Sequence, residues 1–273
     1  ILNFAFNLPQ MGSKEFKAAV HHEIQSYLDV PIDMMSYDYR SRHIDPDPQG
    51  NTINVKAFCA KRDLIEDRIE TLSGAKLKPA AVETELLAIV AMLDFNQYIE
   101  KGKNYVVVDL GESHVSTGLV IDGELQFSKI GHTGAGAVNK SLMSRLDLSY
   151  EQSEIEKLKY SFSQKITNPL TKIIDDAYFD LFKEVKSAKE AVEFYLEHFG
   201  SQAKIDEILL VGGGSQIVNI EDVIEMFFKI PATVVNPFRN IEIFEDSKSS
   251  KNEGIAVLGP YMAIAVRLAL RGV

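Results

Sequence analysis

The sequence predicts an α/β fold with mixed sheets, because hairpins stand beside strand–helix units along the chain. The clearest hairpin unit is residues 105–136, which reads as a buried strand, a turn, a second strand, an Asp-Gly turn and a third strand. The clearest strand–helix unit is residues 205–228, where an apolar strand runs into three glycines and then an amphipathic helix. No repeat of solenoid period and no low-complexity tract interrupts this order.

The first part of the chain predicts a helix and a hairpin. A short strand at residues 3–8 stops at Pro9, and a helix starts at Gly12-Ser13 with apolar residues at helical spacing until Pro31. Residues 34–43 and 53–59 have strand character and flank a Pro- and Gly-bearing turn, so they are expected to pair.

Helices are expected next at residues 63–72 and 85–98. Asp63 is expected to cap the first of these, and Gly74 to supply its left-handed C-terminal residue. After the 105–136 unit, the periodicity predicts helices at 137–146, 150–162, 170–199, 221–228 and 256–270, and strands at 205–211 and 232–235. The last helix is nearly all apolar and is expected to pack inside, whereas the acidic pair Asp175-Asp176 indicates a solvated face.

Composition excludes several classes of protein. The chain has 273 residues, 45% of them hydrophobic and 25% charged, as in ordinary globular proteins of one or two domains. A net charge of −10 with scattered Lys and Arg argues against a nucleic-acid binder. The single cysteine, Cys59, excludes an internal disulfide and a cysteine-based zinc site, and fits a reducing compartment. No apolar run reaches the ~18 residues of a membrane span and no signal peptide is visible, so a cytoplasmic location is expected.

The 105–136 unit carries the first chemical candidate. The apolar run Val106 to Val108 delivers the carboxylate of Asp109 at the end of a strand, and Gly111 then lets backbone N–H groups approach a ligand. Hydroxyls follow at Ser113, Ser116 and Thr117. Oxygen ligands, backbone donors and little side-chain bulk suit a phosphate with its magnesium, although a plain turn has the same ending.

The second candidate is the run ILLVGGGSQ at residues 208–216. A buried strand that enters three glycines and then a helix is typical of an anion- or nucleotide-binding turn. The run is neither a dinucleotide fingerprint nor a P-loop, because the required glycine spacing and the Gly-Lys-Ser/Thr ending are absent. A tight strand-to-helix turn stays the alternative reading.

Along nearly its whole length the chain resembles the PilM family of actin-like proteins of type IV pilus assembly and, more distantly, the cell-division protein FtsA. The resemblance rests on five segments in the family's order: LPQMGSKEFKAAVHHEIQSYL at 8–28, VVVDLGESHVSTGLVIDGELQFSK at 106–129, SEIEK at 153–157, ILLVGGGSQIVNIEDVIEMFFKIPATVVNPF at 208–238 and AIAVRLALRG at 263–272. It implies an actin-like ATPase fold of two domains. Domain I would be residues 1–104, with subdomain 1C at about 8–60, completed by the C-terminal helix at 256–273; domain II would be 105–255, with a 2B insertion at about 141–200.

The resemblance also implies ATP and Mg²⁺ as cofactors. Asp109 would hold magnesium through water. The phosphates would contact Gly111, Ser113, Ser116 and Gly134. The adenosine would be enclosed by Gly212, Gly213, Gly214, Ser215 and Gln216 together with Glu154 and Lys157. No residue is assigned as catalytic, and the expected turnover is at most that of a weak ATPase.

Departures from the family pattern keep three functions open. The family's first phosphate loop would lie ahead of Ile1, Ala135 stands where a second glycine is usual, and Asn139 replaces a threonine. Lys129 replaces an arginine, and Val218-Asn219 a Pro-Gly. The first hypothesis is an ATP-binding scaffold that binds the N-terminal tail of a PilN-like inner-membrane protein and so lies peripheral to that membrane, coupling pilus motor ATPases to it. The second is a scaffold without nucleotide, and the third is a small-molecule kinase of the same fold.

Overall fold

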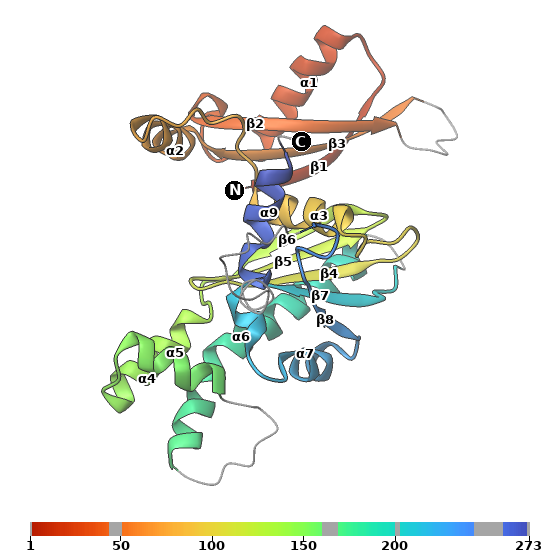
Figure 1. Ribbon diagram of the computed structural model, residues 1–273. Coiled ribbons are helices and arrows are strands. Elements are labelled where there is room, and N and C mark those ends of the chain that lie inside the picture. Colours follow the sequence, from red (N-terminus) through yellow and green to blue (C-terminus); the bar gives the residue numbers. More distant parts are fainter. Residues whose placement is uncertain (1, 44–50, 160–168, 200–202, 243–258, 272–273) are drawn as a thin grey trace. The chain divides into compact units, whose positions relative to one another are not determined.

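The computed structural model describes residues 2–43, 51–159, 169–199, 203–242 and 259–271. The chain forms two compact units, Ile1–Thr84 and Glu85–Val273, and each contains its own sheet (Figure 1). The larger unit combines strands with helices, and its sheet has both parallel and antiparallel pairs. The predicted α/β class with mixed sheets is confirmed.

The smaller unit is a three-stranded antiparallel sheet in the order β1-β3-β2, with strands β1 (Leu2–Pro9), β2 (Met35–His43) and β3 (Thr52–Lys61). The predicted pairing of β2 with β3 is confirmed, and the turn between them lies outside the described residues. Helix α1 (Ser13–Ser26) covers one face, where Val20 and Ile24 pack with Val55 and Ala57. A short 3₁₀ helix, η1 (Ile32–Met34), follows Pro31.

Helix α2 (Arg62–Gly74) corrects two expectations about its ends. Asp63 does not cap it, because the helix begins one residue earlier and the Asp63 side chain accepts from the N–H of Leu64 at 2.8 Å. Gly74 is not the left-handed residue: Lys76 has φ +62° instead. The N–H of Leu77 donates to the carbonyl of Leu72 at 2.9 Å, which ends the helix. The left-handed position in such a helix end is usually a glycine, and here it is Lys76.

The larger unit contains a five-stranded sheet in the order β6-β5-β4-β7-β8. Its strands are β4 (Tyr105–Leu110), β5 (Val115–Ile121), β6 (Glu124–Ile130), β7 (Glu207–Val211) and β8 (Ala232–Val234). The first three form the predicted antiparallel unit, whereas β7 and β8 add in parallel to β4. This register sets Asp109 opposite Ser116 on β5 and opposite Val211 on β7.

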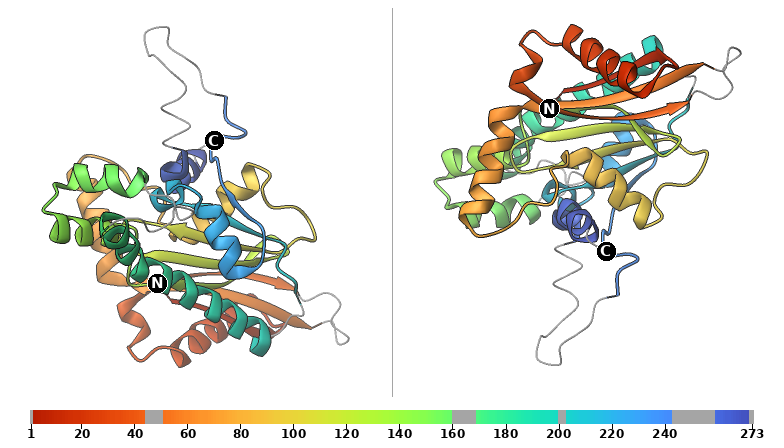
Figure 2. Two further views of the ribbon diagram at one scale, coloured as in Figure 1. Left: turned by 90° about the horizontal axis from the view of Figure 1, so that it is seen from below. Right: turned by 90° about the horizontal axis from the view of Figure 1, so that it is seen from above.

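Helices cover both faces of this sheet, which explains why its central strands are continuously apolar. On one face, Val106, Val108 and Leu110 of β4 share a core with α4 (Gly136–Leu146), α6 (Pro169–Phe199) and α7 (Ile220–Phe228). On the other face, Tyr105 and Val107 pack with α3 (Glu85–Phe95) and α9 (Ala263–Leu270). Figure 2 shows α6 running across its face of the sheet beside α7, with α4 and α5 (Tyr150–Lys159) at one end.

The C-terminal helix begins later than predicted. Gly259–Met262 forms a 3₁₀ helix, η3, so α9 starts at Ala263, and residues 256–258 lie outside the described part of the chain. The helix also buries only one side. Ala263 and Val266 pack toward α3, while Leu268 on the far side is 49% exposed. The mostly apolar composition of α9 therefore did not mean that every side of the helix is buried.

Candidate functional site

Three turns of the larger unit meet where β4 and β7 end. They are the hairpin turn after β4 at residues 111–114, the turn at 134–136 before α4, and the turn after β7, which continues into the 3₁₀ helix η2 (Gly213–Gln216). The ends of neighbouring parallel strands share one edge of a sheet, and this edge is the usual ligand position in open α/β sheets. Backbone contacts join the three turns directly.

The first contact joins the hairpin turn to the turn before α4. The N–H of Ala135 donates to the carbonyl of Gly111 at 2.8 Å, and the N–H of Gly136 donates to the carbonyl of Glu112 at 2.9 Å. A Cβ on Gly134 would lie 2.5 Å from the nitrogen of His114, and one on Gly136 would lie 2.8 Å from the carbonyl oxygen of Glu112. Glycine is therefore required at 134 and 136, whereas Ala135 is accommodated.

The second contact brings the glycine run against both other turns. Gly212 has φ +83°, and a Cβ there would collide with Oδ1 of Asp109. A Cβ on Gly214 would lie 2.8 Å from Cβ of Leu110 and 3.1 Å from Cβ of Ala135. Ser215 closes the turn on itself, because its hydroxyl donates to the carbonyl of Gly212 at 2.7 Å. These glycines allow the turn after β7 to pack closely against Asp109, Leu110 and Ala135.

Asp109 is the buried acid at this junction. Its side chain is 8% exposed and accepts no hydrogen bond from any residue that the structure describes. Its pKa is raised to about 6, mainly by burial and secondly by the nearby Glu85 carboxylate, whereas His114 opposes the shift. His114 itself lies 3.1 Å from Glu85, between Nε2 and Oε2. Ser116, opposite Asp109, has a buried hydroxyl that also finds no partner within the described chain.

Glu154 and Lys157 lie on α5, where they join it to α4. The ammonium of Lys157 is 2.6 Å from Oε2 of Glu154 and donates to Oδ1 of Asn139 at 2.8 Å. The amide of Asn139 donates to the same Glu154 oxygen at 2.7 Å and to the hydroxyl of Ser153 at 3.1 Å. The Lys157 side chain is 4% exposed and that of Glu154 is 26% exposed. Lys157 is thus engaged inside the protein, and Glu154 is the more accessible partner.

Three residues near the turns were not predicted from the sequence: Glu112, Tyr150 and Tyr261. The Tyr150 hydroxyl donates to Oε1 of Glu112 at 3.4 Å. The Tyr261 ring lies against Gly213, where a Cβ would collide with it. Its pKa is raised by burial first and then by the carboxylates of Glu154 and Glu112. Glu112 stood within the hairpin motif, whereas no local signal could place Tyr261 against a glycine far away in the sequence.

The predicted residues therefore fall into two groups. Asp109, Ser116 and the close-packed glycines meet at the strand ends, and the members of this group are Asp109, Gly111, Ser116, Gly134, Gly212, Gly213 and Gly214. The others lie at its margin: Ser113 is exposed in the hairpin turn, Ser215 and Gln216 lie in η2, and Glu154 and Lys157 lie on α5.

The described residues contain neither a membrane-spanning helix nor a ready-made metal site. None of their helices is long and apolar enough to cross a membrane. Within the same ranges, no group of three or more His, Cys, Asp or Glu side chains is arranged to hold a metal ion by itself. A cation at Asp109 would therefore need further oxygen ligands from a bound molecule or from water.

A family model described as type IV pilus assembly protein PilM matches residues 7–273. Among solved structures, a chain of a PilM–PilN type IV pilus biogenesis complex is 21% identical, with a TM-score of 0.81 over 99% of this chain and 76% of that one. Ethanolamine utilization protein EutJ from Carboxydothermus hydrogenoformans is 15% identical, with a TM-score of 0.46 over 73% of this chain and 57% of that one. MreB5 of Spiroplasma citri bound to ADP is 10% identical, with a TM-score of 0.49 over 76% and 64%.

The raised pKa of Asp109 predicts a pH dependence of stability. The carboxyl has an ordinary pKa of 3.8 and a folded pKa of about 6, so the folded chain holds this proton more tightly. The free energy of unfolding should therefore fall between about pH 4 and pH 6, by up to roughly 3 kcal/mol. Asp109→Asn should lack this fall. Urea unfolding across that pH range measures it, and parallel profiles for the two proteins would contradict the burial argument.

The buried pair on α5 predicts a large loss of stability on truncation. Lys157→Ala leaves Glu154 and the Asn139 carbonyl without their cation and should cost about 3–5 kcal/mol. Lys159 lies two residues on, with its side chain 67% exposed and 3.4 Å from Glu156. Lys159→Ala should therefore change the free energy of unfolding by no more than about 0.5 kcal/mol. Equal losses in the two variants, measured by urea unfolding, would show that Lys157 does not hold α4 against α5.

Proposed function

The chain belongs to the PilM family of type IV pilus assembly proteins and has the predicted actin-like fold. We propose that it is a scaffold that binds Mg-ATP and the tail of a PilN-like protein. The observation that carries the nucleotide proposal is the meeting of three glycine-built turns around buried Asp109, whose carboxylate accepts no hydrogen bond from the described residues. Such a junction offers backbone donors, a carboxylate and little side-chain bulk on the turns themselves, which suits a polyphosphate and its cation.

The hairpin turn and the 134–136 turn would hold the phosphates. Gly111, Ser113, Ser116 and Gly134 supply backbone N–H groups or hydroxyls at these turns. The unpartnered hydroxyl of Ser116 supports this assignment, because buried polar atoms normally have a partner and one is missing here among the described residues. A phosphate oxygen would satisfy it.

The charges around the junction support the proposal that magnesium binds there. The carboxylates of Asp109, Glu85, Glu112 and Glu154 lie on or near the turns, and the nearest buried ammonium, Lys157, is engaged by Glu154. A free polyphosphate would be repelled by this arrangement, and bound Mg²⁺ would supply the positive charge that joins it to Asp109. Asp109, acting through water, is the residue that would hold the cation.

The glycine run would hold the adenosine. Gly212, Gly213 and Gly214 give the turn little side-chain bulk of its own, although the Tyr261 ring lies against Gly213, and Ser215 and Gln216 follow in η2. Glu154 is the more exposed member of the Glu154–Lys157 ion pair and is proposed to contact the adenosine, while Lys157 holds the Glu154 carboxylate in position. Tyr261, which lies against Gly213, would contact or yield to the base.

The role of the nucleotide would be to bias a conformational equilibrium rather than to drive rapid turnover. No described side chain is assigned as a catalytic base, so activity is proposed to be at most that of a weak ATPase. A nucleotide can change partner affinity only if it binds two states of the scaffold unequally. Two domains that clasp it would provide those states.

A division into actin-type domains is proposed on the same basis. Domain I would comprise residues 1–104 and the C-terminal helix at 256–273, and domain II residues 105–255. Helix α3, from the first of these segments, packs against α9, from the last, on one face of the sheet. The contact joins these two segments to each other, and both helices also pack on the sheet of residues 105–255 within the compact unit Glu85–Val273.

The partner is proposed from the family and from an aromatic surface on the smaller unit. The similar solved structure is a PilM–PilN complex. In this chain β1 is an edge strand, and the ring of Phe4 stacks on Tyr27 with centroids 5.0 Å apart. Tyr27 and Leu2 are each 47% exposed. An extended tail with apolar side chains would find an open strand edge and an aromatic surface there, and would tie the chain to the inner membrane.

A scaffold without nucleotide is the second candidate. The observation in its favour is that the Tyr261 ring already lies against Gly213 at the proposed adenosine turn. A small-molecule kinase of the same fold is less well supported, because it needs a catalytic base beside an acceptor pocket. ATP consumption that depends on an acceptor would indicate it.

Intact protein is expected to bind Mg-ATP in calorimetry, and removal of magnesium with EDTA should abolish binding because the acidic turns repel free ATP. Asp109→Ala should also abolish it. Asp94→Ala, which removes an exposed carboxylate of α3 in the same unit, should not. Absence of binding by the wild-type protein at millimolar ATP would replace this proposal with the nucleotide-free scaffold.

A fluorescent peptide with the N-terminal sequence of a PilN-type protein should bind, as measured by fluorescence anisotropy. Tyr27→Ala should weaken binding by roughly tenfold or more, because an aromatic anchor is lost. Tyr37 is 36% exposed on the opposite edge strand and provides the matched control. Unchanged affinity in Tyr27→Ala, or no binding by the wild-type protein, would refute the proposed surface.

A further inference from the structure

A tyrosine ring lies beside the junction where the three turns meet. Tyr261 belongs to η3, the 3₁₀ helix that precedes α9. The backbone of η3 is tied to the glycine run, because the N–H of Gly212 donates to the carbonyl of Pro260 at 3.0 Å. Gly259 and Pro260 are both buried. The fold therefore fixes the backbone that carries this ring.

The Tyr261 ring packs on main chain at one place and is open elsewhere. A Cβ on Gly213 would collide with Cε1 of the ring, so glycine at this position is what lets the ring approach the turn. Tyr261 is nevertheless 47% exposed. A tyrosine that rests on backbone and keeps much of its surface uncovered is placed as an aromatic platform, on which a flat ring can stack.

The other neighbours of Tyr261 come from the hairpin turn and from α5. The pKa of its phenol is raised by burial first and then by the carboxylates of Glu154 and Glu112. The Tyr150 hydroxyl donates to the same Glu112 side chain at 3.4 Å, at the start of α5. The Tyr261 ring therefore lies where the glycine run, the hairpin turn and α5 come together.

The charges near the ring decide which part of a nucleotide it can accept. The carboxylates of Glu112 and Glu154 repel phosphate groups, and the ammonium of Lys157 is engaged by Glu154 at 2.6 Å. A neutral base is not repelled, and the hydroxyls of an attached sugar can donate to carboxylates. This side of the junction therefore suits the nucleoside end of the ligand.

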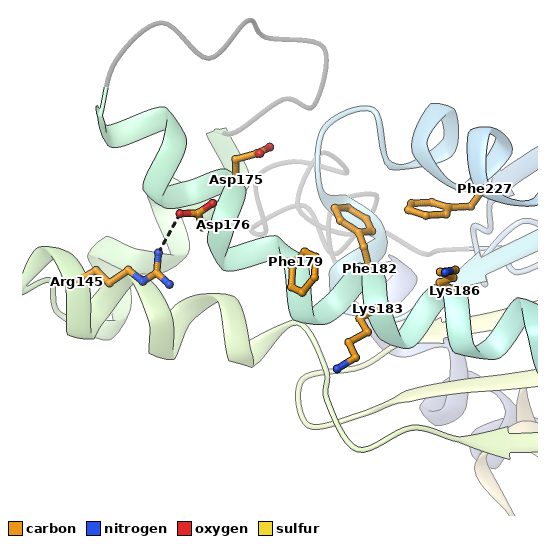
Figure 3. A pocket seen from close by; sticks show the side chains of 8 residues that line it. All are labelled: Arg145, Asp175, Asp176, Phe179, Phe182, Lys183, Lys186 and Phe227. Carbon is orange, nitrogen blue, oxygen red and sulfur yellow. Dashed lines mark hydrogen bonds and ion pairs between the residues drawn. The ribbon is translucent and has the colours of Figure 1, made fainter.

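A groove on the outer face of α6 offers other aromatic rings but lies away from the turns. It has a volume of about 750 Å³, and Figure 3 shows Phe179 in it beside Phe182 and Phe227. None of its lining residues belongs to the three turns. Arg145, which lines it from α4, lies in the last turn of that helix, whereas the 134–136 turn precedes the first. The groove is therefore a poor place for the base of a nucleotide whose phosphates lie at the turns.

We propose that Tyr261 is the stacking platform for the purine base of the bound nucleotide. The inference rests on the proposed function, because it assigns the base of the nucleotide whose phosphates the turns would hold. Stacking uses the face of a base and not its hydrogen-bonding edge. Adenine and guanine should therefore be accepted alike, and a pyrimidine, which has a single ring, more weakly.

Calorimetry on the intact protein tests this by comparing Mg-ATP with Mg-tripolyphosphate, which presents a phosphate chain without a nucleoside. The wild-type protein should bind Mg-ATP more tightly by roughly tenfold or more, because a stacked base adds to the phosphate contacts. Tyr261→Ala should remove most of this advantage, and Tyr261→Phe, which keeps the ring, should restore it. Mg-GTP should show the same pattern, and Mg-UTP a smaller advantage.

Phe179 provides the matched control, because it is a 69% exposed ring in the same unit. Phe179→Ala should keep the full advantage of Mg-ATP. Equal affinity of the wild-type protein for the two ligands would overturn the platform and leave the phosphate site standing. So would a Tyr261→Ala variant that keeps or increases the advantage, since the ring would then cover the site instead of supporting the base. A wild-type protein that binds neither ligand would overturn the platform and the proposed nucleotide function together.

Discussion

The parallel register between β4 and β7 is the constraint on which the candidate site depends. It sets Asp109 opposite Val211, so the hairpin turn after β4 and the glycine run after β7 end at one edge of the sheet although they lie far apart in the chain. Helices cover both faces of these strands, and a shift of one residue would turn Asp109 from its present face toward the core formed with α4, α6 and α7. The packing of the sheet therefore determines the position of the acid.

Glycine allows the three turns to pack closely at this edge of the sheet. Side chains at Gly134, Gly136 or Gly212 would collide with the backbone of the hairpin or with Asp109 itself. Close backbone packing also leaves Asp109 dehydrated, which raises its pKa to about 6 and leaves it to be satisfied by a cation or a proton. The same contacts thus account for the shape of the junction, for its acidity and for the proposed need for magnesium.

Local patterns were sufficient to predict the class of fold, the antiparallel unit that contains Asp109 and the turn at Gly212, because strand periodicity and glycine runs depend on neighbouring residues alone. Contacts between distant segments were not predictable in this way. Asn139 reads as a departure from the family, yet it satisfies both Lys157 and Glu154. Tyr261 contacts Gly213 only because the fold brings these two distant segments together. Lys76 takes the left-handed conformation that was expected of Gly74, and α9 has an exposed side although its residues are mostly apolar.

In the proposed function, three turns act together as one nucleotide site. Hydrogen–deuterium exchange of the intact protein with and without Mg-ATP tests it most directly, because exchange reports each turn separately. Protection is predicted together at residues 109–116, 134–136 and 212–216, with none at the outer face of α6. Protection at only one of these turns, or no change at any of them under saturating Mg-ATP, would contradict the account.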